Sequence, residues 1–158
     1  MGLMPGYKGH LIGGVAAFGI TLLVSTKIFA LDYSLVMAAE WLICALAGSL
    51  FPDIDVKSKG QKYFYWVVLA LFIFCILWQK YKLLAGCSVI VVMPMLVRHR
   101  GIFHRLWFVI LVPLAIWFFV SFYVPYIQQR MLLDTIFFIA GAISHLWLDL
   151  GIRRMLRL

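Results

Sequence analysis

Charged residues are scarce in this 158-residue chain, and their scarcity excludes most kinds of soluble protein. They form 13 % of the sequence, whereas roughly 25 % is usual in globular domains. Hydrophobic residues form 65 % and aromatic residues 16 %. A soluble domain of this size cannot hide so much apolar surface. Soluble enzymes, secreted disulfide scaffolds and disordered tails are therefore excluded, and a polytopic membrane protein remains.

Thiols and acidic groups are few as well. Cys44, Cys75 and Cys87 lie in apolar runs without a Cys-x-x-Cys pair, which predicts packing residues and not a disulfide or zinc set. Six Asp and Glu stand against 14 Lys and Arg, for a formal net charge of +8. In a soluble protein this balance would indicate nucleic acid. In a membrane protein it indicates positively charged cytoplasmic loops, so we expect no nucleic-acid partner.

Six apolar runs predict an all-α transmembrane bundle of about six spans, because one span needs about 20 residues. The runs cover residues 11–30, 35–51, 64–79, 83–97, 106–124 and 132–150. The third and fourth are short, and they form either two spans or one re-entrant hairpin. Both ends of that pair return to the same side in either case. We expect a single integral membrane domain over residues 1–158.

The basic residues predict the orientation of the bundle. One side of the predicted spans holds ten of them: Lys8, Lys57, Lys59, Lys62, Arg98, Arg100, Arg105, Arg153, Arg154 and Arg157. The other side holds four: Lys27, Lys80, Lys82 and Arg130. Cytoplasmic loops carry the excess of Lys and Arg, so the first side is predicted to be cytoplasmic, together with both termini.

Residue size distinguishes inner from outer spans. The first, second and sixth runs are rich in Gly, Ala and Ser, whereas residues 63–66 and 116–119 are bulky aromatic stretches of the third and fifth. Small faces let membrane helices approach closely. We therefore expect the first, second and sixth spans to form an inner bundle, with the third and fifth toward lipid.

Histidine and aspartate gather at the predicted cytoplasmic ends of the spans. The residues concerned are His10, Asp53, Asp55, His99, His104, His145 and Asp149. Imidazole and carboxylate are ligands that a borderline divalent ion such as zinc takes. Simpler explanations are an interfacial side chain for His10, and incidental members of the basic turn at residues 98–105 for His99 and His104.

Spacing relates some of these residues to one another. His145 and Asp149 are four apart and share one helix face. Pro52 is expected to end the second span, so that Asp53 and Asp55 point to similar sides of an extended segment. Both pairs also have a purely structural explanation. His145 can pair with its neighbouring acid Asp149, and Asp53 and Asp55 can balance the charge of nearby lysines.

Four short motifs follow one another along the chain: His10, Asp53-Ile54-Asp55, His99-Arg100-Gly101-Ile102-Phe103-His104 and Ser144-His145-Leu146-Trp147-Leu148-Asp149. In this order they resemble the LexA-regulated, membrane-bound metal-dependent hydrolase family, the YdjM-like inner-membrane proteins. That family is distantly similar to zinc-dependent phospholipase C and to fungal single-strand nucleases. The resemblance implies a multi-pass protein of the bacterial inner membrane with a role in stress response. It also implies phosphoester hydrolysis with one or two divalent ions, zinc first and manganese as the alternative.

The resemblance also implies roles for particular residues. The predicted metal ligands are His10, Asp53, His99, His104, His145 and Asp149. Asp53 and Asp55 are the predicted catalytic carboxylates, Asp53 as a bridging ligand and Asp55 as a ligand or general base. Arg98, Arg100 and Arg105 are predicted to bind a substrate phosphate, because guanidinium groups match phosphate oxygens bidentately. The expected partners are the lipid bilayer and a phospholipid or lipid-linked phosphate substrate.

Two other functions stay open at this point. Val56-Lys57 follows the Asp-Ile-Asp step where the family usually has His-Pro, which favours a non-enzymatic, metal-stabilised sensor, assembly or stress-response partner. The hypothesis of a small transporter is supported by Glu40 alone, because an acidic residue inside a membrane span is a functional candidate. Pairing of Glu40 with Lys27 is the simpler explanation. The oligomeric state is not predicted.

Overall fold

The chain folds into helices, as predicted. The computed structural model describes residues 6–55, 59–79 and 102–155. Within these ranges the α-helices are α1 (Tyr7–Lys27), α2 (Leu35–Leu50), α3 (Lys59–Leu77), α5 (Leu106–Tyr123) and α6 (Gln128–Met155). Three 3-10 helices connect or extend them: η1 (Phe51–Asp55), η2 (Ile102–His104) and η3 (Pro125–Ile127). No strand occurs in the described ranges.

Four of these helical segments are long and apolar enough to cross a membrane. They are Tyr7–Lys27, Leu35–Ile54, Leu106–Tyr123 and Pro125–Gly151. A shorter apolar helix, Tyr65–Leu77, lies within α3. The predicted run at 83–97 falls outside the described residues, so the total of six spans and the cytoplasmic orientation stay predictions.

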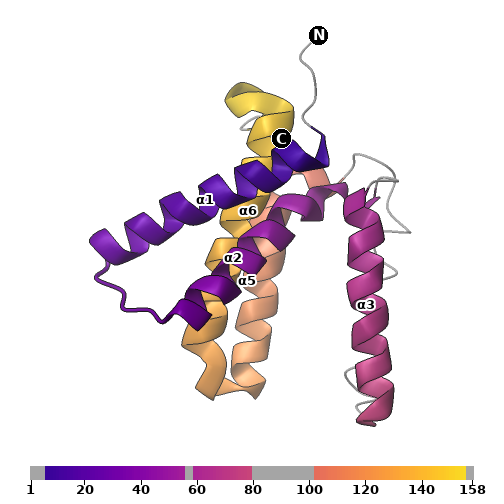
Figure 1. Ribbon diagram of the computed structural model, residues 1–158. Helices are drawn as coiled ribbons and strands as arrows, with labels where there is room; N and C mark the ends of the chain where they lie inside the picture. Colours follow the sequence, from indigo (N-terminus) through magenta and orange to yellow (C-terminus); the bar gives the residue numbers. More distant parts are fainter. Residues whose placement is uncertain (1–5, 56–58, 80–101, 156–158) are drawn as a thin grey trace.

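Helices α1, α2 and α6 pack against one another and form the inner bundle that the small residues predicted (Figure 1). Glycine is required where α2 crosses α6, because a Cβ at Gly48 would overlap the Phe138 carbonyl oxygen. A Cβ at Gly141 would likewise overlap the carbonyl oxygen of Ala45. Close backbone approach of this kind is typical of helix packing in membranes.

The two bulky helices behave differently from each other. Helix α3 contacts η1 and otherwise stands beside the bundle (Figure 1), in agreement with its predicted outer position. Helix α5 packs along α6, where Val109 joins a buried cluster with Ala142 and Leu146. The rest of α5 exposes large hydrophobic side chains, in agreement with its predicted position outside the inner bundle. Aromatic residues are exposed mainly at its far end, where Phe119 and Phe122 project outward.

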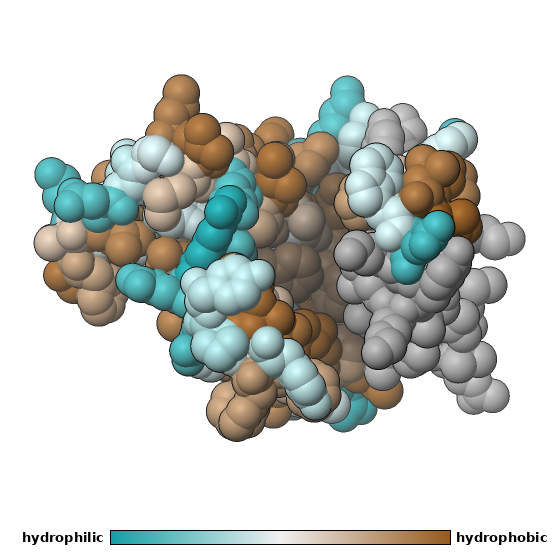
Figure 2. All heavy atoms as spheres, turned by 90° about the horizontal axis from the view of Figure 1, so that it is seen from below, coloured by the Kyte–Doolittle hydropathy of each residue, from teal (hydrophilic) through white to brown (hydrophobic). Residues whose placement is uncertain are grey.

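The two ends of the bundle differ in character. Four segments meet at one end of the bundle, which is the upper end in Figure 1: the 3-10 helices η1 and η2, the first turn of α1 and the last turns of α6. At the opposite end lie residues 28–34 and 124–127, which link the helices. Viewed from there, hydrophilic residues are scattered among hydrophobic ones (Figure 2). The upper end carries the polar cluster described next.

Candidate metal centre

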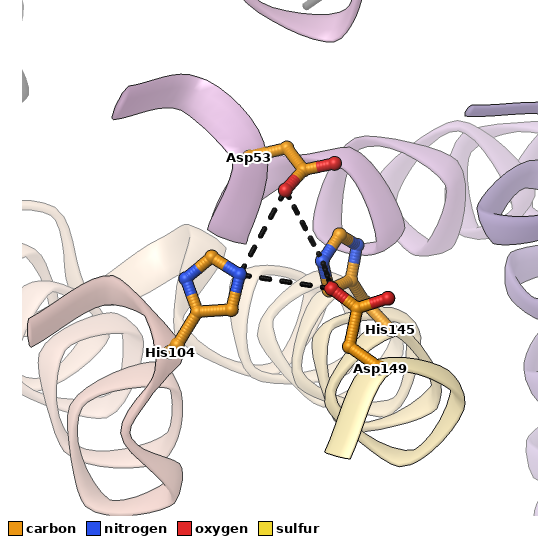
Figure 3. A group of neighbouring side chains, drawn as sticks. All are labelled: Asp53, His104, His145 and Asp149. Carbon is orange, nitrogen blue, oxygen red and sulfur yellow. Dashed lines mark ion pairs between the residues drawn. The ribbon is translucent and has the colours of Figure 1, made fainter. Parts of the chain in front are cut away.

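Four side chains from three segments converge at the upper end of the bundle. They are Asp53 of η1, His104 of η2, and His145 with Asp149 of α6. Each offers one ligand atom, and these four atoms lie within 4.8 Å of one another. Figure 3 shows the four side chains facing a common point. Segments that begin up to 77 residues apart thus supply one group of nitrogen and oxygen ligands.

The distances within this group suit a metal ion better than direct hydrogen bonds. The Nε2 atom of His145 lies 3.3 Å from Asp149 Oδ2 and 3.6 Å from Asp53 Oδ1. The Nε2 atom of His104 lies 3.7 Å from Asp53 Oδ1 and 3.8 Å from Asp149 Oδ2. Ligands about 2.0–2.1 Å from a tetrahedral zinc ion stand about 3.3 Å apart. The four histidine–aspartate separations therefore exceed this spacing by no more than about 0.5 Å.

Helix α6 supplies two of the four ligands because of its periodicity. His145 and Asp149 are spaced i, i+4 and do share one face, as predicted. Gly151 follows with a φ of 67°, a conformation that glycine adopts without steric cost. The regular helix thus continues just far enough to present both side chains.

His145 is oriented by a backbone group that the sequence did not indicate. Its Nδ1 atom lies 2.7 Å from the Ser49 carbonyl oxygen. A carbonyl only accepts hydrogen bonds, so Nδ1 carries a proton and Nε2 is the ring nitrogen that faces the two carboxylates. Nε2 is buried and forms no hydrogen bond among the described residues, and the same holds for Asp149 Oδ1. Buried polar atoms in this state are costly, and an ion would satisfy them.

The segment that carries Asp53 differs from the expected one. Helix α2 passes directly into η1, with the buried Pro52 in its first turn, where a missing N–H is tolerated. The prediction of an extended segment at Asp53 is therefore wrong. The side chain of Asp55 lies outside the described part of the chain, and its catalytic role stays a prediction.

Aromatic packing holds η2 against η1. Phe103 makes edge-to-face contacts with Phe51 and Phe108, with ring centroids 5.6 Å and 5.0 Å apart. Phe103 and the neighbouring His104 are both buried. This packing fixes the position from which His104 faces Asp53.

His10 of α1 lies at the edge of the group. Its ring stacks on that of His145, with centroids 3.8 Å apart and planes inclined by 18°. Its Nε2 atom lies 3.4 Å from Asp149 Oδ1. His10 is thus close to the centre, although it is not one of the four residues whose ligand atoms lie mutually within 4.8 Å.

The remaining predicted site residues have mixed outcomes. Arg105 is exposed, next to His104 and at the start of α5. Arg98, His99 and Arg100 fall outside the described residues. The phosphate-binding role of the three arginines and the ligand role of His99 stay predictions.

Charge and exposure indicate what the group can do. Two carboxylates balance the charge of one divalent ion. The side chain of His145 is inaccessible, whereas that of Asp53 is 23 % exposed and that of Asp149 is 14 % exposed. The two histidines are therefore more deeply buried than the two carboxylates.

Glu40, at the opposite end of α2, has a different partner from the predicted Lys27. Its carboxylate accepts hydrogen bonds from Arg130 Nη2 at 2.7 Å and from Arg130 Nε at 3.0 Å. This bidentate pair joins α2 to α6. It explains an acidic residue in a membrane segment without a transport pathway.

Comparison with known proteins agrees with this picture at the level of the family. No curated protein and no solved structure matches the chain. The similarity to phospholipase C therefore stays a prediction. The family model described as YdjM inner membrane protein matches residues 4–155. Because this match covers nearly the whole sequence, the chain belongs to the YdjM inner membrane protein family.

Proposed function

We propose that this protein is a metal-dependent hydrolase of the bacterial inner membrane that cleaves a phosphoester at the cytoplasmic face. The observation that carries the proposal is the buried Nε2 atom of His145, which the Ser49 carbonyl orients toward two carboxylates. A histidine held by a backbone carbonyl through its other nitrogen is the usual arrangement of a metal ligand. Zinc is the first candidate and manganese the second, because the ligands are imidazole and carboxylate without thiolate.

The side chains have two proposed roles, which are to bind the metal ion and to accept a proton from water. A divalent ion held by Asp53, His104, His145 and Asp149 would supply Lewis-acid chemistry at a phosphoryl group. Asp53, the most exposed of the four, lies where a carboxylate oxygen can accept a proton from water. Asp55 is the other candidate for that role, and an Asp55→Asn variant separates the two.

The position of the centre indicates the substrate class. It lies at the ends of segments long enough to cross a membrane, which is the depth of lipid headgroups. Arg105 follows the candidate ligand His104 in the sequence and is exposed, and a guanidinium group pairs well with phosphate. A phospholipid or lipid-linked phosphate fits this position better than a soluble substrate.

The test starts from metal content. The protein is purified without chelator, supplied with zinc or manganese, and analysed for metal per chain. Phosphatase and phosphodiesterase activities are then measured on phospholipid vesicles. We expect stoichiometric metal and hydrolysis in the parent, and loss of both in Asp149→Asn. Asp32→Asn, an exposed acid at the opposite end, is the matched control and should retain both. A parent without stoichiometric metal would contradict the proposal.

One observation favours a second candidate, a non-enzymatic protein that metal stabilises. The ligands come from η1, η2 and α6, so a bound ion would tie these segments together. At a metal concentration of 100 times Kd, the ion would stabilise the fold by about 2.7 kcal/mol. A rise in melting temperature with metal, without hydrolysis of any phosphoester tested, would favour this candidate.

A further inference from the structure

An open apolar groove lies between α1 and α6. Its volume is about 530 Å³, within the roughly 300–1,000 Å³ that is usual for small-molecule sites. Small residues of α1, among them Gly13 and Ala16, line one side, and Ile143, Trp147 and Leu148 of α6 line the other. The helices touch at Gly13, where an added Cβ would lie 2.7 Å from Leu148 Cδ1. The groove is open because α1 carries small side chains on this face.

The lining of the groove is hydrocarbon with little polar surface. Its polar residues are Thr21 and Ser144, and the Ser144 hydroxyl donates a hydrogen bond of 2.7 Å to the Gly141 carbonyl oxygen of its own helix. Both helices belong to segments long and apolar enough to cross a membrane. A polar ligand would leave its hydrogen-bonding groups unpaired in such a groove, which is costly. An acyl chain of a membrane lipid has no such groups and matches the lining.

The groove begins at the end of the bundle that carries the metal centre. Gly9 and Leu148 line it, and they are the sequence neighbours of His10 and Asp149, whose side chains lie 3.4 Å apart. Helix α1 crosses α6 at this end and then runs away from it at a wide angle (Figure 1). From Gly9 to Thr21, α1 rises about 18 Å at 1.5 Å per residue. One leaflet of the hydrocarbon core is about 15 Å deep, so the groove is as long as one acyl chain needs.

We propose that this groove binds one acyl chain of the lipid substrate and thereby places the phosphoester of that lipid at the metal centre. The inference rests on the proposed hydrolase function and adds the subsite that positions its substrate. Lipid tails are as apolar as the groove, so the chain gains little from the hydrophobic effect on binding. The groove acts through packing and orientation, which hold the reacting group in place. The lipid reaches the centre sideways from the bilayer, between α1 and α6.

Photolabelling tests the binding of the chain without a need for hydrolysis. The full chain in detergent micelles receives phosphatidylglycerol with a photoreactive diazirine on one acyl chain, and mass spectrometry locates the label. We expect several times more label on Ile12, which lines the groove and is 71 % exposed, than on Phe118 of α5, which is 58 % exposed. Label spread in proportion to exposure would overturn the inference.

A ring placed in the groove tests its role in catalysis. Ala16 is exposed in the lining, so Ala16→Phe fills the groove. We expect this variant to lose the label on Ile12. We also expect the ratio of kcat/KM for phosphatidylglycerol to kcat/KM for bis(p-nitrophenyl) phosphate, a soluble phosphodiester, to fall about tenfold or more, since misplacement by about 1 Å can cost about 100-fold. Val15→Phe is the matched control, because Val15 is 51 % exposed and outside the groove lining. It should behave like the parent.

The outcomes separate this inference from the function that it rests on. An unchanged ratio in Ala16→Phe, or a parent that hydrolyses only the soluble diester, would overturn the groove as a substrate site and leave a hydrolase. Label in the groove without hydrolysis of either substrate would contradict the proposed function and leave a lipid-binding groove. Unlabelled groove residues that cross-link between two chains would show a second copy in the groove, which also overturns the inference.

Discussion

The contact between His145 and Ser49 shows how single atoms define the centre. The Ser49 carbonyl accepts a hydrogen bond of 2.7 Å from Nδ1 of His145 and so fixes the orientation of the ring. Both residues are fully buried, so the ring has little freedom to turn. A ligand held in this way loses little conformational entropy when it binds metal.

This orientation predicts a large effect of removing the imidazole. His145→Asn keeps a polar side chain but cannot reach both the Ser49 carbonyl and the ion. We expect metal affinity to fall by about a hundredfold or more, because loss of a supporting group alone costs about 10- to 100-fold. Competition with a coloured chelator measures the change. Affinity equal to that of the parent would show that His145 is not a ligand.

At the scale of elements, the crossing of α2 and α6 depends on glycine. Gly48 and Gly141 each face a backbone carbonyl of the opposite helix. A backbone atom cannot move aside as a flexible side chain does. The packing of these helices therefore leaves no room for a larger residue.

Enlarging Gly141 should destabilise the bundle more than trimming a lipid-facing residue. We expect Gly141→Ala to lower the free energy of unfolding by about 1–3 kcal/mol, the usual cost of overpacking. Gly141→Leu should cost more. Ile116→Ala should cost less than either, because Ile116 is 43 % exposed on α5. Thermal unfolding in detergent gives the ranking, and the reverse order would refute the inner bundle.

The ion pair between α2 and α6 should matter much less. Arg130 is 60 % exposed and Glu40 is 29 % exposed, and exposed pairs contribute about 0–1 kcal/mol. We expect Glu40→Gln to change the melting temperature little and metal content not at all. Loss of bound metal in Glu40→Gln would contradict this prediction and show that the N-terminal end of α2 influences the metal centre.

At the scale of the whole molecule, the centre depends on several segments ending at the same side. The start of α1 and the last turns of α6 meet through His10 and Asp149. A metal ion bound by Asp53, His104, His145 and Asp149 would join η1, η2 and α6 at this junction. The distribution of Lys and Arg alone predicts that the end of the bundle with this centre faces the cytoplasm.

Reporter fusions test the orientation. A fusion at Leu158 should report the cytoplasm, because ten of the 14 Lys and Arg lie on that side. A fusion within residues 79–82 should report the periplasm if the third span crosses fully. A periplasmic signal at Leu158 would reverse the topology and place the centre outside the cell.

Composition and local spacing determined much of this protein. The scarcity of charge predicts a membrane protein, and the long apolar runs predict that it is helical, since one transmembrane helix needs about 20 apolar residues. The small residues of the first, second and sixth runs predict the inner bundle because they set how closely helices approach. The i, i+4 spacing of His145 and Asp149 fixes their shared face, since helix geometry is local.

Only the tertiary structure decided the rest. The choice of Arg130 as the partner of Glu40, 90 residues away, depends on which helices cross. The Ser49 carbonyl and the two oxygens of Asp149 are single atoms whose surroundings no residue pattern encodes. The 3-10 turn at Asp53 arises because α2 continues past Pro52 under the packing of Phe51 and Phe103. Long-range contacts set these features, so local sequence preferences could not predict them.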